Sequence, residues 1–179
     1  SELVGRPSTA AVDLNCYRLQ VSKDVNTSYT RQYFWDITKT VAPATWDIFV
    51  GDQVTSTYTV TAFIVGQQDS AWQVDGSIII SNPAPMDALV TSVIDVLPNG
   101  VAASVNCANG GQLGANNSVI CSYSGQPGGA IAGSNVATVT LETSAGNNDY
   151  MGNAPVIFGA PTTEPSHTIG LTGQQDGPP

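Results

Sequence analysis

The chain has 179 residues, of which only 11% are charged, and its formal net charge at pH 7 is −9. All five basic residues lie within the first 39 positions, so residues 40–179 carry ten acids and no base. Such an acidic surface repels phosphate backbones and anionic lipid headgroups, which argues against nucleic acid or a membrane surface as a partner. The length is sufficient to bury the core of one large β-sandwich.

The composition favours strands and turns over helices. Thr, Ser, Asn, Gln and Gly fill the gaps between Val and Ile, a mixture that suits half-exposed strands and tight turns. No run of about 18 apolar residues occurs, so the sequence predicts no membrane span. The chain begins at Ser1 without a Met, which fits a mature secreted protein whose leader has been removed, although a trimmed chain begins in the same way.

Two strands are predicted near the N-terminus. Residues 16–23 alternate loosely between apolar and polar side chains. Residues 29–39 alternate more strictly and place Tyr33, Trp35 and Ile37 on one face. A period of two is typical of half-buried β-strands.

The middle of the chain predicts a hairpin. A short apolar piece, residues 46–50, precedes residues 53–65, which alternate over their whole length and form the clearest predicted strand. Residues 66–70 (GQQDS) have the composition of a turn. Residues 72–81 then form the second strand, with a bulge at Gly76, and the Asn-Pro-Ala-Pro motif beginning at Asn82 ends it.

The remaining strands complete an all-β domain. Residues 89–97 have apolar side chains at both helical and strand spacing, but the β-branched residues and the following Pro-Asn-Gly turn favour a strand. Three further strands are predicted, at residues 101–107, 118–124 and 135–142. About nine short strands at this spacing predict an Ig-like antiparallel β-sandwich over residues 14–145.

The two ends of the chain are predicted to extend from the sandwich. Residues 1–13 are polar and form an extended N-terminal segment, which is a candidate donor strand for a neighbouring subunit. Residues 146–179 are rich in Gly, Pro and Gln and form a C-terminal extension. The tail from Ala154 onward is the second candidate donor.

The cysteines indicate an oxidising compartment. Cys107 and Cys121 flank a short loop rich in Asn and Gly between two predicted strands, which favours a local disulfide over two buried thiols. Cys16 is left over and is interpreted as a small buried apolar side chain. A secreted protein, extracellular or on a cell surface, is the corresponding expectation.

Residues from about 16 to 142 resemble a recurrent β-sandwich repeat of large bacterial surface proteins. The resemblance rests on the Tyr-Thr-Arg-x-Tyr-x-Trp-x-Ile-x-Lys pattern ending at Lys39, on the Asn-Pro-x-Pro motif at residues 82–85, and on the cysteine pair. It implies an Ig-like or prealbumin-like sandwich on a cell exterior that serves as a stalk, adhesin or sheath, with no catalytic signature. Both flanks depart from the pattern of the repeat.

No catalytic constellation is recognised, and an enzyme is not expected. His167 is the single histidine and lies in the tail, where a solvated side chain is favoured over a catalytic triad. No cofactor is expected, and the residues for a zinc site are lacking. Calcium is a low-ranked alternative because Asn and Asp also favour turns; its candidate ligands are Asp69, Asn147, Asn148 and Asp149.

Two kinds of covalent modification are considered. Asn26 and Asn116 begin glycosylation sequons, a pattern that also occurs by chance. Lys23 or Lys39 could form an isopeptide bond with an asparagine on a distant strand such as Asn135, but sequence gives no geometry and plain surface lysines are the favoured interpretation.

The sequence therefore predicts an extracellular structural protein, a filament or sheath subunit that forms a head-to-tail homopolymer by strand exchange. The alternative is a monomeric adhesin or glycan-binding module in which Trp46 or Trp72 stacks on sugar rings. Against this alternative, all three tryptophans lie beside apolar runs and are predicted to be core residues. A secreted hydrolase ranks third.

Overall fold

The computed structural model describes residues 12–108 and 111–172. Within these ranges every regular element is a strand, and no helix could span a membrane. All strand pairings are antiparallel, so the predicted antiparallel β-sandwich of nine strands is confirmed. The strands are β1 (Gln20–Lys23), β2 (Asn26–Ala42), β3 (Thr57–Ser81), β4 (Ala88–Val96), β5 (Ala102–Cys107), β6 (Gln112–Leu113), β7 (Ser118–Gly125), β8 (Gly133–Thr143) and β9 (Gly146–Val156).

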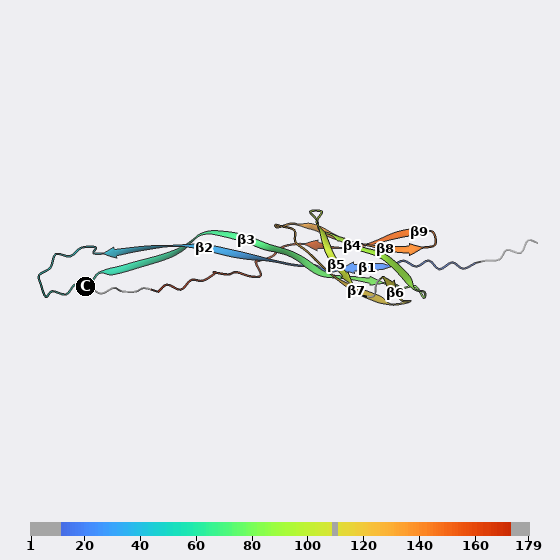
Figure 1. Ribbon diagram of the computed structural model, residues 1–179, viewed down its shortest axis with the longest axis horizontal. Helices are drawn as coiled ribbons and strands as arrows, with labels where there is room; N and C mark the ends of the chain where they lie inside the picture. The colour runs from blue at the N-terminus through green and yellow to red at the C-terminus, as the bar shows by residue number, and fades with distance from the viewer. Residues whose placement is uncertain (1–11, 109–110, 173–179) are drawn as a thin grey trace, which may run out of the picture.

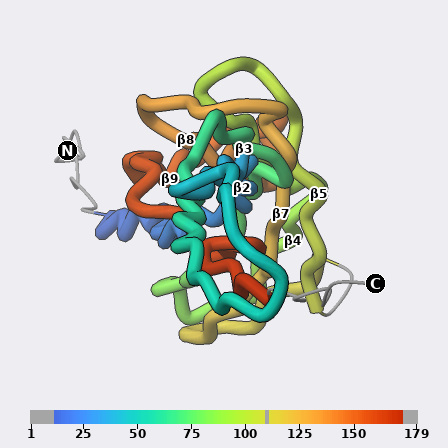
Figure 2. The backbone as a smooth tube through the Cα atoms, turned by 90° about the vertical axis from the view of Figure 1, so that its left-hand side faces the viewer, coloured from blue at the N-terminus to red at the C-terminus, as the bar shows by residue number. Residues whose placement is uncertain are grey.

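The strands form one sheet that folds over on itself. Their order is β1-β3-β7-β5-β4-β8-β9, with β2 beside β3 and β6 beside β4. The two ends of this order meet, because a Cβ built on Gly152 of β9 would lie 2.8 Å from the backbone oxygen of Val21 in β1. Glycine is therefore required for this close approach. Viewed from one end, the strands surround a common interior (Figure 2).

The core lies between the two layers of this folded sheet. Val74, Ile78 and Ile80 of β3 point inward from one layer and are fully or almost fully buried. Ala137 and Val139 of β8 meet them from the other layer. Burying a side chain of this size contributes about 1.5–3 kcal/mol. The core is closed by further buried residues from several elements, namely Leu19, Val90, Leu97, Leu113, Cys121, Tyr123 and Val156.

The Asn-Pro-Ala-Pro motif is a corner between β3 and β4. Asn82 is buried, and its side-chain amide donates hydrogen bonds to the carbonyl oxygens of Met86 and Gly114. Its side-chain oxygen accepts a hydrogen bond from the backbone N–H of Ala84. The motif therefore has a structural role, which is to satisfy the backbone groups of a corner that contains two prolines.

The strand β3 is longer than predicted. Residues 66–70, expected to form a turn, continue the strand and pair with residues 30–34 of β2. The pairing register shifts between Phe34 and Trp35 and again between Ser28 and Thr30, and Ala71 has a φ of 52°. Bulges at these points absorb the turn-forming residues without ending the strand. The predicted hairpin is thus replaced by a much longer one, β2–β3, which projects from the sandwich (Figure 1).

The sheet also extends beyond the C-terminal boundary expected from the sequence. Residues 146–156, assigned to the C-terminal extension, form β9 and pair with β8 along their whole length. Gly152, Ala154 and Val156 face inward and are buried. Glycine and alanine at inward positions give little apolar periodicity, which is why the strand was not recognised. The predicted N-terminal segment, residues 1–13, lies almost entirely outside the described residues.

Candidate functional site

The outer part of the β2–β3 hairpin has one apolar and one threonine-rich face. Residues that pair across antiparallel strands share a face, as do alternate residues of one strand. The register therefore gathers an apolar set on one side, here named the apolar hairpin face: Ile37, Val41, Tyr58, Val60 and Ile64. The other side carries Thr38, Thr40, Thr57, Thr59 and Thr61.

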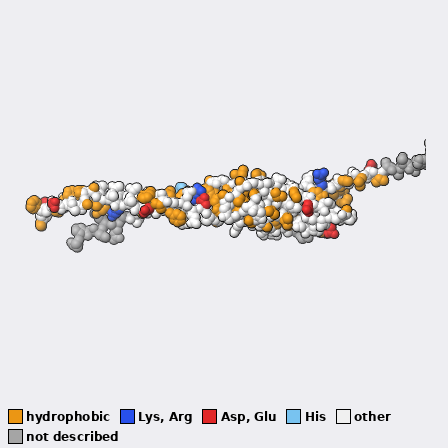
Figure 3. Space-filling view, turned by 90° about the horizontal axis from the view of Figure 1, so that it is seen from above, with side chains coloured by type: hydrophobic (Ala, Val, Ile, Leu, Met, Phe, Trp, Pro, Cys, Tyr) orange, Lys and Arg blue, Asp and Glu red, His pale blue; other side chains and the backbone are white. Residues whose placement is uncertain are grey.

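The apolar hairpin face is open to solvent. Ile37 and Ile64 are each 50% exposed and Tyr58 is 57% exposed. In the space-filling view, hydrophobic side chains continue along the hairpin to its far end (Figure 3). A two-stranded hairpin is marginally stable by itself in water, and exposed apolar patches of this kind commonly mark interaction surfaces.

The C-terminal segment (residues 157–172) lies along β2 (Figure 1). Thr163 forms a parallel bridge with Thr30, and the backbone N–H of Arg31 donates to the Thr163 carbonyl oxygen at 2.9 Å. The Trp35 indole N–H donates to the Ser166 carbonyl oxygen at 2.8 Å. An extended segment thus already occupies part of the outer edge of β2, in the manner of an added strand.

The base of the hairpin is held by aromatic stacking and an ion pair. The rings of Tyr29 and Trp72 stack with their centroids 4.2 Å apart, and Phe158 from the C-terminal segment meets both rings edge-on. Arg31 donates to both carboxylate oxygens of Asp69, at 2.7 and 2.8 Å. This pairing lowers the pKa of Asp69.

The tryptophans do not lie in the core. Trp35 and Trp72 are half-buried, and Trp46, in the loop that joins β2 to β3, is 44% exposed. The prediction that all three are core residues is therefore wrong, because the hairpin carries them away from the sandwich. Cys16, predicted to be buried, is exposed. It lies outside the strands, because β1 begins only at Gln20.

A second site lies inside the sandwich, where Lys23 and Asp95 form an ion pair. Both side chains are completely buried. Lys23 is in phase with Val21 of β1 and with Leu19 just before that strand, and Asp95 precedes Leu97 by two residues. The period of two therefore directs both side chains inward. Lys23, favoured as a plain surface lysine, is instead a core residue. Lys39, by contrast, is exposed on the hairpin, 4.5 Å from the Tyr58 ring centroid.

Asn135 lies next to this ion pair. The register of β4 and β8 pairs Asp95 with Ala137, which makes Asn135 a diagonal neighbour of Asp95 on the same inward face. Asn135 is fully buried, and among the described residues neither its side-chain oxygen nor its nitrogen has a hydrogen-bond partner; the same holds for Oδ1 of Asp95. Unpaired polar atoms in a core are costly, so three of them beside one ion pair indicate a special role.

Tyr123 links the members of this buried site. Its ring centroid lies 4.0 Å from Lys23 Nζ, and its hydroxyl donates to the Asp24 carbonyl oxygen at 2.6 Å. A Cβ on Gly76 would lie 3.0 Å from the Tyr123 ring and 2.6 Å from the Asp24 oxygen, so glycine is needed to seat the ring. Together, Lys23, Asp95, Tyr123 and Asn135 form a buried polar cluster.

Burial sets the charge states within the cluster. Desolvation lowers the pKa of Lys23, although the hydrogen bond and the charge of Asp95 act in the opposite direction. Desolvation also raises the pKa of Tyr123, and the charge of Asp95 acts in the same direction. The lysine amine is therefore easier to deprotonate than a solvated one.

The candidate calcium ligands occupy strands. Asp69 lies in β3, where Arg31 of β2 binds its carboxylate. Asn147, Asn148 and Asp149 lie in β9, opposite residues 140–142 of β8. Asp149 accepts a hydrogen bond from the Thr140 hydroxyl at 2.7 Å. Within the described ranges, no three His, Cys, Asp or Glu side chains gather into a metal-binding group.

The remaining candidate residues lie on the surface. The sequon residues Asn26 and Asn116 are both exposed. His167 is exposed, contacts the edge of the Tyr33 ring and lies 3.6 Å from Glu164.

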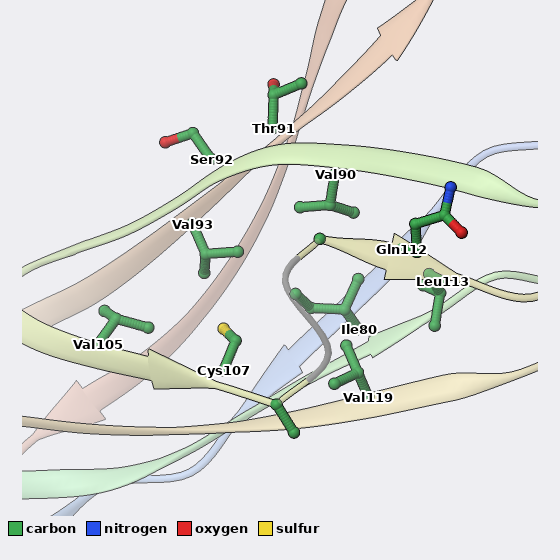
Figure 4. A pocket seen from close by; sticks show the side chains of 12 residues that line it. Ile80, Val90, Thr91, Ser92, Val93, Val105, Cys107, Gln112, Leu113 and Val119 are labelled. Atoms are coloured by element: carbon green, nitrogen blue, oxygen red, sulfur yellow. The ribbon is translucent and has the colours of Figure 1, made fainter.

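The predicted disulfide joins neighbouring strands. Cys107 of β5 lies directly opposite Cys121 of β7, and the two are bonded. Beside it, a hollow opens between β4, the end of β5 and the start of β6 (Figure 4). Aliphatic side chains dominate its lining, and none of its described lining residues carries a free acid or base.

Comparison of this chain with protein-family models, with curated proteins and with solved structures found no match. The resemblance to repeats of bacterial surface proteins therefore stays a prediction.

Proposed function

We propose that the protein is an extracellular structural protein, a subunit of a cell-surface filament or sheath that assembles by strand exchange between neighbouring copies. The observation that carries the proposal is the apolar hairpin face, a long amphipathic two-stranded surface that the described part of its own chain leaves exposed. The disulfide supports an oxidising, extracellular location. The protein acts as a building unit and has no enzymatic role.

The partner on this face is a second copy of the chain. The C-terminal segment already accepts a hydrogen bond from Trp35, which belongs to the same side of β2 as Ile37, so a neighbouring copy would extend an existing contact. Charge favours the same partner, because Arg31 and Lys39 on the hairpin are the last bases in the sequence and the sandwich is acidic. Contact between unlike surfaces propagates into open fibres.

The exchanged strand is the C-terminal segment. Beyond Phe158, which packs on the base of the hairpin, its contact with β2 consists mainly of a short parallel bridge and a few hydrogen bonds, and most of its side chains are exposed. A segment held this weakly can leave its own hairpin and pair with that of a neighbour at low cost. Residues 1–13 are the second candidate donor.

Negative-stain electron microscopy and sedimentation velocity of the full chain test the proposal. The wild type should form fibres or large oligomers whose amount rises with concentration. The double variant Ile37→Thr/Val60→Thr keeps β-branched side chains but makes the face polar, and should remain monomeric. The matched control Thr38→Ser/Thr61→Ser changes a cross-strand pair on the opposite face and should assemble like the wild type.

Two shortened chains identify the donor strand. A chain that ends at Pro161 lacks the part of the C-terminal segment that bridges to β2, and should no longer form fibres. A chain that begins at Leu14 should still assemble. The opposite pattern would transfer the donor role to residues 1–13, whereas single particles from every version, at all concentrations, would contradict assembly itself.

A monomeric adhesin or glycan-binding module is the second candidate function. The exposed Trp46 favours it, because its indole N–H is fixed at 2.8 Å from the Ser56 hydroxyl and the ring is presented at the end of the hairpin. Aromatic rings in such positions can stack on sugars. Glycan-array binding that is lost in Trp46→Ala and retained in Trp72→Ala would support this function over assembly.

A further inference from the structure

The buried polar cluster contains three groups of a kind that react with one another when they are suitably placed. It contains a primary amine, a carboxamide and a carboxyl group, and all three side chains are withdrawn from solvent. The amine and the carboxyl are in direct contact, and the carboxamide is a diagonal neighbour of the carboxyl. The carboxamide makes no hydrogen bond with the described residues, so no competing interaction holds it in its unreacted state.

We infer that Lys23 and Asn135 become joined by an intramolecular isopeptide bond, and that Asp95 is the catalytic acid and base of this single reaction. The inference does not depend on the proposed function. It assigns to the cluster a covalent modification that uses only atoms of the chain itself. Burial of an ion pair beside a carboxamide that has no hydrogen-bond partner among the described residues would otherwise be a large cost without a purpose.

The reaction balances without a cofactor or an oxidant. The neutral Lys23 Nζ attacks Cγ of Asn135, so the Nζ–Cγ bond forms and the carbonyl electrons move onto Oδ1. When the tetrahedral intermediate collapses, the Cγ–Nδ2 bond breaks and ammonia leaves. Asp95 accepts a proton from the attacking amine and delivers it to the departing nitrogen, which is the usual function of a carboxyl group in general acid and base catalysis.

The surroundings of the cluster favour each step. Desolvation lowers the pKa of Lys23, which increases the fraction of the nucleophilic neutral amine. The core excludes water, which would compete as a nucleophile. The Tyr123 ring covers the amine and positions it, because its hydroxyl is anchored on the Asp24 backbone.

The bond would connect the first strand to the last strand but one. Lys23 ends β1 and Asn135 lies near the start of β8, so the crosslink encloses the body of the sandwich, including the disulfide. Pulling on the chain from outside these two residues would load the crosslink and leave the enclosed strands unstretched.

Intact mass spectrometry of the full chain, reduced and denatured, tests the inference directly. Loss of ammonia predicts a mass below that of the sequence by about 17 Da. Asp95→Asn and Asn135→Ala should each restore the mass of their own sequences. Lys39→Ala, which removes an exposed lysine from the hairpin, should keep the deficit. A wild-type chain with the full sequence mass would overturn the inference, whether or not the variants fold.

Trypsin digestion locates the bond. The sequence contains no Lys or Arg after Lys39, so residues 40–179 remain one fragment. If Lys23 is crosslinked, trypsin cannot cleave after it, and residues 19–31 should stay attached to that fragment through a branched linkage. Release of separate peptides 19–23 and 24–31 would contradict the bond, and attachment at any other residue would reassign it. Neither result depends on assembly.

Discussion

The sandwich and the hairpin use the same alternating pattern to different ends. In the sandwich, inward residues of β3 and β8 meet a second layer, and Ile78 and Val139 are fully buried. In the hairpin, the same strand β3 contains Tyr58 and Val60, and both are exposed. The difference shows that alternation specifies a strand with an apolar face, while the presence of a second layer decides whether that face becomes a core or an interface.

The largest difference between the two regions should be the loss of stability when a charged pair is broken. Asp95→Ala blocks the crosslink, leaves the Lys23 amine buried without a counter-ion, and should reduce the free energy of unfolding by about 3–5 kcal/mol. Asp69→Ala breaks the Arg31 ion pair on the half-exposed surface of the hairpin, where water replaces the lost partner, and should change the stability little. Urea denaturation of both variants measures the contrast. Equal losses would show that the two regions are equally closed to solvent.

Truncating an apolar side chain should also destabilise the sandwich much more than the hairpin. Ile78→Ala leaves a cavity in the core and should cost about 2–5 kcal/mol. Ile37→Ala, in the monomeric protein, should change the stability by no more than about 0.5 kcal/mol, since half of that side chain is already in water. Thermal unfolding followed by circular dichroism distinguishes the two. A large effect at Ile37 in dilute solution would mean that the hairpin face is covered within the monomer.

The disulfide belongs to the sandwich and should stabilise only that region. Replacing both Cys107 and Cys121 by Ser frees a loop of 14 residues, which should lower the free energy of unfolding by about 3 kcal/mol in the chain-entropy account. The hairpin register should be unaffected. Chemical shifts of residues 31–69 provide the check, and changes there would show that the two regions are coupled.

The smallest expected effect is a pH dependence at the junction of the two regions. Asp24 accepts hydrogen bonds from the Ser77 backbone N–H at 2.6 Å and from the Ser77 hydroxyl at 2.7 Å, and these bonds lower its pKa. Its contribution to stability is therefore complete above its unfolded pKa, near about 4, and is lost as pH falls through the lower folded value. Urea midpoints of wild type and Asp24→Asn should differ at neutral pH and converge in acid. A constant difference would argue against titration of Asp24.

Much of the strand pattern was accessible from the sequence because each strand packs one face against a second layer. The predicted strands at residues 101–107, 118–124 and 135–142 correspond to β5, β7 and β8 within one or two residues at each end. The predicted turn at residues 66–70 failed because bulges let a turn-like sequence remain in a strand when a long partner is available. Strand β9 was missed because its inward residues are small.

The candidate sites were harder to predict from the sequence than the strands, and the physical reason differs between the two sites. The buried polar cluster left a signal, since Lys23, Asp95 and Asn135 each occupy an inward phase next to apolar residues. The sequence suggests Lys23 or Lys39 as a partner for Asn135, but nothing in it indicates that Asp95 joins them, because contact between layers has no local signature. The openness of the hairpin face likewise depends on the absence of a covering layer, which alternation does not encode.

Hydrogen exchange tests the contrast between the two regions most directly. The amides to follow are those of residues 37–42 and 57–62, compared between dilute and assembled fractions of the wild type. If the hairpin is the surface on which copies meet, these amides should exchange quickly in the dilute fraction and become protected on assembly, while amides of β7 and β8 stay equally protected in both. Hairpin amides that exchange at the same rate in both fractions would contradict the account.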